Sequence, residues 1–483
     1  MAFHGIRVNE EDNTVHSVTD AASGIPFVVG TCPVHLAESG EASVNTPVLI
    51  RSMEEAKKKL GYSEDFDKYT ACEVMYTNLQ LFGVSPVVFV NVLDPAKHVK
   101  AFAKQTVTVD KMQAVVPVDG ALKNGLKVTA DSTELEEETD YILARKGEKV
   151  CVTLLPDGKA ASALTVEVEG KQVDPSLVTE EDIIGGYNAE DGTETGLELI
   201  RQVYPRFGMT VGTIVAPKYS KKKAVAAVIE AKCEEINGVF RADAVVDLDA
   251  STCTKYTDVK AAKDALGVSS EHTLVLWPKV KVGDLVLHAS SVTAALVQYM
   301  DQQNDGVPSR SPSNQDAKID AAVLDDGTEV MLDFVTASAL NDDGVATFIN
   351  ANGWVLWGNE TAAYPKSTSQ KAKFWCARRF FTWRTNYFIT KYIRCIDSTA
   401  NRKLIESICD EENMACNGLV SAGVCASASI EFRDEDNTAE TLADGILVFR
   451  QTFGLFGPAK TINNTLVVDL DSVVEALGGA SNE

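Results

Sequence analysis

The sequence predicts an α/β (α+β multi-domain) protein: a discontinuous mixed-sheet α/β domain, an inserted antiparallel β domain, a C-terminal α+β domain, and extended N- and C-terminal arms. Three observations predict this class. Short, continuously apolar runs typical of buried strands alternate with helix-patterned stretches. Runs of alternating polarity interrupt this order after about residue 97. The 483 residues, 45% of them hydrophobic, suffice for about three domains.

The first part of the chain contains an arm and the beginning of the α/β domain. Residues 1–23 carry few large apolar groups and are predicted as a linking arm. The run Gly24-Ile-Pro-Phe-Val-Val-Gly30 is typical of a buried strand. A helix is expected over Met53–Leu60, because Ser52 can cap its start and Gly61 follows its end. A second helix over 69–82 and a strand over 87–92 complete residues 24–97.

Residues 98–185 are predicted as an inserted outer β domain. They contain four short alternating runs, and Pro156-Asp-Gly-Lys159 is typical of a turn between two of them. The α/β pattern resumes over 186–345. Helices are expected there over 194–204, 221–237, 259–266 and 290–303, and strands over 209–215, 242–249 and 273–277.

Residues 346–462 are predicted as the C-terminal domain. A strand pair is expected over 347–357 with Asn352-Gly353 as its turn, followed by helices over 371–394 and 402–414 and a strand over 446–449. Residues 463–483 are predicted as a linking strand, over 464–470, and a frayed tail.

Composition and charge exclude several classes of protein. The net charge of −24 disfavours a role in binding nucleic acid, because an acidic surface repels phosphate. No apolar run approaches the ~20 residues that span a bilayer, and we expect a soluble protein made in a cytoplasm. The ten cysteines contain no Cys-x-x-Cys pair and the six histidines no ligand cluster. We therefore predict no metal site, no cofactor and no catalytic residue.

One enzymatic alternative stays open. Asp247 and Asp249 follow a buried strand and could share a magnesium ion in a phosphohydrolase, with Asp247 attacking phosphorus. The signal is weak, because acids often end strands and the same pattern recurs at Asp469 and Asp471. The sequence contains no glycine-rich loop for nucleotide phosphates.

The stretch 361–396 carries eight cations and no acid, with aromatic side chains between them. Three interpretations are possible. The stretch can be a solvated amphipathic helix, a docking face for an acidic protein, or a stacking surface for single-stranded RNA.

Several segments together resemble contractile tail sheath proteins of tailed (myovirus-type) bacteriophages and of related contractile bacteriocins. The segments lie in the same order along nearly the whole chain outside the β insert: Gly24–Pro33, Pro47–Ser52, Tyr69–Cys72, Leu81–Val84, Trp277-Pro278, Gly306–Asn314, Leu340–Thr347, Gly353–Thr361, Ile396–Arg402 and Gly445–Phe449.

The resemblance implies a structural, non-enzymatic subunit of the virion, assembled in the host cytoplasm. Subunits would polymerise as stacked hexameric rings around a tail tube and contract to drive the tube through the bacterial envelope. The partners would be further copies of the chain, the tube protein, and baseplate and terminator proteins, without nucleic acid or membrane insertion.

The resemblance also assigns candidate residues for assembly. Terminal strands of one subunit would join a sheet of a neighbour by β-augmentation. The strand residues here are Thr14, Val15, His16, Ser17 and Val18, and Thr465, Leu466, Val467, Val468 and Asp469. Gly24, Gly457 and Pro458 are the expected hinges. Lys371, Lys373, Arg378, Arg379 and Arg384 are the candidates for a tube-facing surface.

Overall fold

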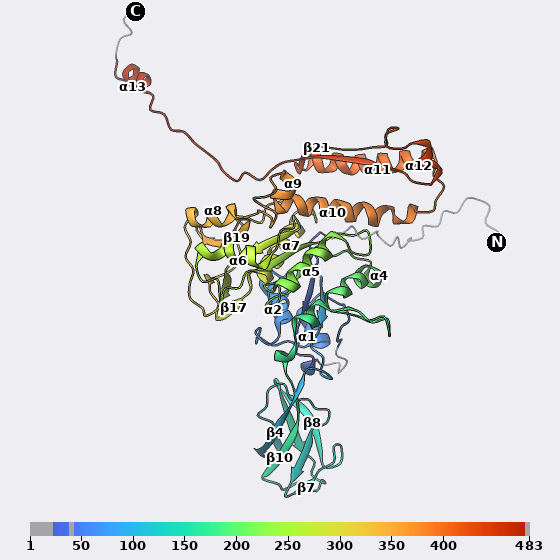
Figure 1. Ribbon diagram of the computed structural model, residues 1–483. Coiled ribbons are helices and arrows are strands. Elements are labelled where there is room, and N and C mark those ends of the chain that lie inside the picture. Colours follow the sequence, from blue (N-terminus) through green and yellow to red (C-terminus); the bar gives the residue numbers. More distant parts are fainter. Residues whose placement is uncertain (1–22, 38–42, 479–483) are drawn as a thin grey trace, which may run out of the picture. The chain divides into compact units, whose positions relative to one another are not determined.

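The computed structural model describes residues 23–37 and 43–478, and the chain divides into two compact units, 1–401 and 402–483 (Figure 1). No described helix is long and apolar enough to cross a membrane. The first unit contains a large mixed sheet and an inserted pair of small sheets, and the second contains helices packed with a two-stranded sheet. The predicted α/β class is confirmed.

An eight-stranded sheet forms the centre of the first unit, in the order β2-β3-β1-β13-β14-β15-β19-β20. Its inner strands are parallel, and the outermost strand at each side, β2 or β20, runs antiparallel to its neighbour. The strands span Val48–Ile50, Val87–Asn91, Pro26–Gly30, Thr213–Val215, Asp243–Asp247, Thr273–Leu276, Val345–Asn350 and Trp354–Trp357. Most are buried on both faces, which explains their continuously apolar sequences.

Most helices of this unit lie where their periodicity predicts them, whereas those over Glu180–Ile184 and Phe334–Asp342 were not predicted. α1 spans Met53–Leu60, and the Ser52 hydroxyl accepts a hydrogen bond from the backbone N–H of Glu55. The others are α2 Thr70–Tyr76, α3 Glu180–Ile184, α4 Val203–Phe207, α5 Lys223–Glu234, α6 Val259–Leu266, α7 Ala289–Gln302, α8 Phe334–Asp342, α9 Gln370–Lys373 and α10 Trp375–Tyr392. α7 is buried along most of its length and packs against β14 and β13.

Three local differences from the sequence predictions have physical reasons. The helix expected over 194–204 is a 3-10 helix, Gly196–Gln202, followed by α4, and it cannot extend back to residue 194, because Gly196 has a positive φ of 58°. The predicted helix over 69–82 ends in a π-helical turn, Thr77–Phe82. A small sheet of β16 Lys279–Val282, β17 Leu285–Leu287 and β18 Ala321–Val323 was not predicted, because its strands are short.

The insert consists of two antiparallel sheets, β4-β10-β6-β7 and β5-β9-β8 (Figure 1). Its strands are β4 Val99–Thr108, β5 Gln113–Val115, β6 Lys127–Ala130, β7 Thr133–Glu134, β8 Tyr141–Lys146, β9 Lys149–Leu154 and β10 Thr165–Val173. Val99 and Val173 are register partners, so the insert enters and leaves the body at one place. Most of its buried apolar side chains form a hydrophobic core separate from that of the body, whereas Val173 at the end of β10 belongs to the core of the body. A short hairpin, β11 Gly186–Tyr187 and β12 Glu194–Thr195, follows α3.

The second unit consists of α11 Arg402–Ser421, β21 Cys425–Glu431, α12 Ala439–Ala443, β22 Arg450–Leu455 and α13 Leu470–Ala476. β21 and β22 pair antiparallel, and α11 packs on β21. The structure places the division at 401/402, whereas the sequence suggested 345/346, because β19 and β20 complete the large sheet. The strand expected over 446–449 begins at Arg450 instead, since the Asn437 side chain binds the backbone of Val448.

Candidate functional site

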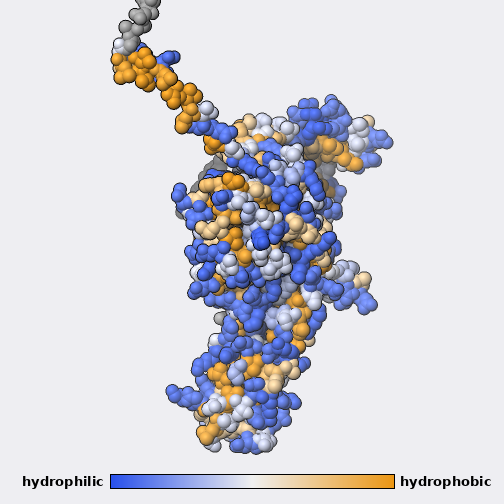
Figure 2. All heavy atoms as spheres, turned by 60° about the vertical axis from the view of Figure 1, so that its left-hand side comes forward, coloured by the Kyte–Doolittle hydropathy of each residue, from blue (hydrophilic) through white to orange (hydrophobic). Residues whose placement is uncertain are grey.

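The segment predicted as the C-terminal linking strand is fully exposed. Leu466, Val467 and Val468 have 89%, 83% and 78% of their surface accessible. The segment forms no strand in the subunit, because none of the described chain lies beside it to complete a hydrogen-bonded ladder. Figure 2 shows its hydrophobic side chains as orange spheres along the extended end of the chain. A run of β-branched and apolar side chains in water is a feature of a segment that binds a partner.

Beyond β22 the chain also contains the predicted hinge at Gly457 and Pro458. Gly457 is exposed and Pro458 half-buried, and both lie outside any helix or strand. A hinge at this position remains a prediction.

The predicted N-terminal strand, residues 14–18, lies outside the described residues. The structure does correct the prediction of a hinge at Gly24. Gly24 is buried, and a Cβ at this position would lie 2.9 Å from Oδ2 of Asp301. The Ser23 hydroxyl lies 2.8 Å from the same oxygen and donates to it. Gly24 is therefore a close-packing glycine shortly before β1, which disfavours a hinge at this position.

The second unit contains a two-stranded sheet. β21 and β22 pair over six residue positions between Cys425–Leu455 and Glu431–Arg450. The Asn413 side chain of α11 binds the backbone N–H and C=O of Ile430, which holds the helix against the sheet. No third strand joins this sheet within the described chain. A narrow sheet with available edges can accept added strands.

The prediction of a cationic, tube-facing helix is wrong for three of its five residues. Arg378, Arg379 and Arg384 are buried in α10. Nη1 of Arg378 donates to Oε1 of Glu271 at 2.5 Å, and Arg379 forms a two-pronged ion pair with Asp301 in α7. A buried cation requires an acidic partner. Glu271 and Asp301 lie far from α10 in the sequence, so the charges counted within residues 361–396 do not reveal them.

The other two cations lie nearer the surface. Lys371 is exposed and lies 3.8 Å from Glu271. Lys373 is half-buried, with its ammonium group 4.8 Å from the centre of the Tyr364 ring and 5.1 Å from that of Phe374. Their role as tube-facing residues remains a prediction.

The aspartates of the enzymatic alternative have structural partners. Asp247 is buried at the end of β14, and its carboxylate accepts hydrogen bonds from the backbone N–H of Ser290, at 2.8 Å, and from the Ser290 hydroxyl. Ser290 lies in the first turn of α7, so Asp247 satisfies an N–H group that the helix leaves open. Burial raises the pKa of Asp247, which disfavours the anion that a nucleophile or metal ligand needs.

Asp249 pairs with Lys221, with 2.9 Å between Oδ1 and Nζ, and binds Ser251 in the following turn. No cluster of three or more histidine, cysteine or acidic side chains that could hold a metal ion occurs among the described residues.

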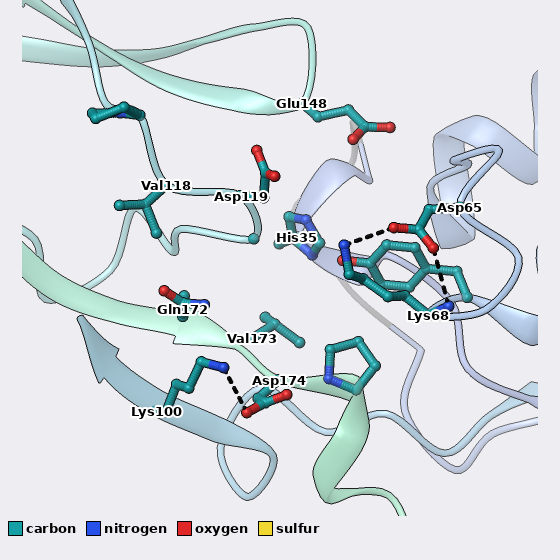
Figure 3. Close-up of a pocket in the computed structure, with 14 residues that line it drawn as sticks. His35, Asp65, Lys68, Lys100, Val118, Asp119, Glu148, Gln172, Val173 and Asp174 are labelled. Carbon is teal, nitrogen blue, oxygen red and sulfur yellow. Dashed lines mark hydrogen bonds and ion pairs between the residues drawn. The ribbon is translucent and has the colours of Figure 1, made fainter.

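A cavity of about 400 Å³ lies at the joint between the insert and the body (Figure 3). Charged side chains line it and pair with one another: Lys100 with Asp174 at 2.9 Å, and Lys68 with Asp65 at 2.6 Å. Burial lowers the pKa of His35 in its wall to about 3, so this imidazole is neutral. None of the predicted assembly residues lies in this cavity.

The likeness to known proteins extends over the whole chain. No protein-family model matches it. It is 24% identical over 503 residues to the tail sheath protein of Burkholderia phage BcepMu, which covers 99% of each chain. It is 25% identical over 488 residues to a putative prophage major tail sheath protein of Pseudomonas aeruginosa strain UCBPP-PA14, covering 98% of each.

The chain is similar over nearly its whole length to tail sheath proteins. The predicted resemblance is confirmed, and these relatives are not enzymes.

Solved sheath structures share the fold. The sheath of an extracellular contractile injection system (PVC), in its contracted state, matches with a TM-score of 0.56 at 12% identity, over 98% of this chain and 99% of that one. The sheath tail protein of Desulfitobacterium hafniense matches with a TM-score of 0.54 at 13% identity, over 94% of this chain and 100% of that one.

Sequence reasoning missed one helix, α13, which follows the predicted linking strand. Its signal was present: Asp469 can cap a helix, and apolar residues recur at positions 470, 473, 474 and 477. The mixed polarity of Asp469 and Asp471 suggested the end of a strand instead.

Proposed function

We propose that this chain is the structural subunit of the contractile tail sheath of a phage or phage-like particle. The observation that carries the proposal is the exposed, strand-patterned segment Thr465–Asp469, in a chain similar to tail sheath proteins over nearly its whole length. Within a single subunit this exposed segment makes no stabilising contact, whereas in a polymer it can connect one copy to the next.

In the proposed assembly the linking strand of one copy adds to the sheet β21–β22 of another. Main-chain hydrogen bonds supply the affinity in this kind of binding, and alternate side chains supply specificity. Five residues offer several such bonds, each contributing roughly 0.5–1.5 kcal/mol net. Repeated at every contact of a lattice, these bonds keep subunits connected while their bodies move.

The finer features follow from the same model. Copies form stacked hexameric rings around a tail tube, with an N-terminal strand at residues 14–18 as a second connection. Contraction drives the tube through the bacterial envelope, with the free energy stored in the assembly. Lys371 and Lys373 remain the candidates that face the tube. Baseplate proteins lie at one end of the stack of rings and terminator proteins at the other.

The test is assembly of the purified chain, measured by sedimentation and negative-stain electron microscopy. We expect tubes or stacked rings from the full chain and isolated subunits from a chain ending after residue 463. Val467→Pro removes one N–H donor and should act like the truncation, whereas Val467→Thr keeps the backbone and the β-branched shape and should assemble. Normal tubes from the truncated chain would contradict the proposal. A chain lacking residues 1–20 tests the N-terminal strand in the same way.

A further inference from the structure

The helix α13 follows the linking strand without a connecting loop. Its cap is Asp469, whose Oδ1 accepts a hydrogen bond from the backbone N–H of Ser472 at 3.1 Å. Four apolar side chains lie at the spacing i, i+3, i+4, i+7 and share one face: Leu470, Val473, Val474 and Leu477. All four are exposed, so this face covers no part of the described subunit.

A helix of this length is marginal by itself. Nucleation is costly, and isolated helices shorter than about 12 residues are barely stable in water. Most helical stability in proteins comes from packing an apolar face against a partner. An isolated helix with a complete apolar face therefore indicates a partner outside the subunit.

The position of the strand limits where that partner can be. Seven residues at about 1.5 Å each make a helix about 10 Å long, and it begins where the strand ends. If the strand lies on the sheet of a second copy, the helix lies within about one helix length of the end of that strand, so exposed apolar surface on the same copy is within its reach.

The second unit exposes a matching apolar surface at one end of that sheet. The connection from β21 to β22 contains α12 and presents Leu442, Ile446 and Val448 to solvent; we name these three residues the α12 patch. Asn437 accepts from the Val448 N–H at 2.7 Å and donates to the Val448 carbonyl at 2.8 Å. These hydrogen bonds fix the backbone of the α12 patch in the free subunit, so the patch is preorganised for binding.

The α12 patch lies where β21 ends and β22 begins, next to the register pair Glu431–Arg450. A strand added in the same direction as β21, at either edge of the sheet, ends at this patch. A strand added in the opposite direction ends near Ala422, before β21 begins.

We propose that α13 of one copy packs its apolar face on the α12 patch of a second copy, which also accepts the linking strand in the direction of β21. The helix acts as a clasp that closes over the end of the added strand. This inference rests on the proposed function, because it needs the strand addition.

The first experiment separates the clasp from the strand. A chain ending after Asp469 keeps the strand and loses α13, and we expect half-maximal assembly at a concentration at least about tenfold higher than for the full chain. Val474→Glu should have the same effect. Ala476→Glu places the same charge away from the apolar face and should assemble like the unchanged protein.

The two proposals then fail in different ways. If the chain ending after Asp469 assembles like the full chain while the chain ending after residue 463 does not, the clasp is wrong and the linking strand stands. If the chain ending after residue 463 also assembles normally, the proposed strand addition is wrong as well.

The second experiment tests the direction of the strand. Val474→Cys protein is mixed with Ile446→Cys protein, assembled and oxidised, and each variant alone measures the background from the native cysteines. We expect a cross-linked dimer from this mixture and none above background from Val474→Cys with Ala422→Cys. A dimer only in the second mixture, or in neither, would overturn the inference.

Discussion

Replacing Arg379 should reveal how strongly the large sheet and α10 depend on one buried ion pair. The side chains of Arg379 and Asp301 are 2% and 7% exposed, and the guanidinium binds both carboxylate oxygens. Arg379→Met leaves a buried carboxylate without its counter-charge, which costs about 3–5 kcal/mol in comparable sites. The double variant Arg379→Met/Asp301→Leu removes both charges and should recover most of this loss.

The expected change in melting temperature follows from the size of the unit. Unfolding 401 residues at about 2.1 cal/mol/K each gives an entropy of about 0.8 kcal/mol/K. A loss of about 4 kcal/mol then lowers the melting temperature by about 5 °C. The double variant should stay within about 1 °C of the unchanged protein, because the Ser23 hydroxyl, which loses Asp301, still has the Gly306 carbonyl as an acceptor at 2.8 Å.

The effect should also depend on pH. Burial raises the pKa of Asp301, and the charge of Arg379 opposes that rise. Without the guanidinium the pKa rises further, so the folded variant holds a proton that its unfolded chain releases. Stability is then gained as the pH falls, and the deficit of Arg379→Met should narrow between pH 7.5 and 5.5. Thermal unfolding followed by circular dichroism measures the two variants and the unchanged protein. An unchanged melting temperature for Arg379→Met, or a double variant no better than the single one, would refute the reasoning.

Three further predictions concern the body and the insert. Asp247→Ala should destabilise the protein by about 1–3 kcal/mol, seen as a lower melting temperature, because the N–H of Ser290 loses its acceptor. Phosphatase activity with Mg²⁺ should be at background in the unchanged protein and in the variant. Activity that is present in the unchanged protein and lost in the variant would support the enzymatic alternative. Lys263 donates to the carbonyls of Asp343, Gly344 and Tyr364, and burial lowers its pKa to about 8. Lys263→Met should therefore have a lower melting temperature than the unchanged protein, and the difference should grow as the pH rises from 8 towards 10. The reason is that Lys263 loses its proton at a lower pH in the folded protein than in the unfolded chain, so the unchanged protein gains stability over this range. A difference in melting temperature that shrinks over this range would contradict the assigned pKa. Replacing residues 100–172 with two glycines should leave a folded body that still assembles, because the insert has its own core and its ends are adjacent. An aggregated body in gel filtration would show that the two cores depend on each other.

The secondary structure of the body is largely a local property, and this is why periodicity alone predicted it. Ser52 and Gly61 delimit α1 as the sequence suggested, and β1, β3 and β14 are buried runs of apolar residues with turns beside them. The Asn352-Gly353 turn between β19 and β20 is equally local. In each case neighbouring residues carry the signal, so no knowledge of the tertiary structure was needed.

Domain limits and the state of charged residues depend on contacts between distant segments. β19 and β20 join the large sheet through β15, some 70 residues earlier, so the sequence placed a boundary inside one unit. Arg378 and Arg379 looked like a solvated cationic face, because their partners Glu271 and Asp301 lie more than 70 residues away in the chain.

For assembly, the sequence by itself determined that a strand-forming segment lies near the C-terminal end, and its resemblance indicated the kind of polymer. Only the tertiary structure decided that Thr465–Asp469 has no partner within the described subunit and that β21 and β22 form a sheet of only two strands among the described residues. It also decided that Gly24 is packed rather than free. The physical reason is that strand propensity is local, whereas the presence or absence of a hydrogen-bonding neighbour is a property of the whole fold.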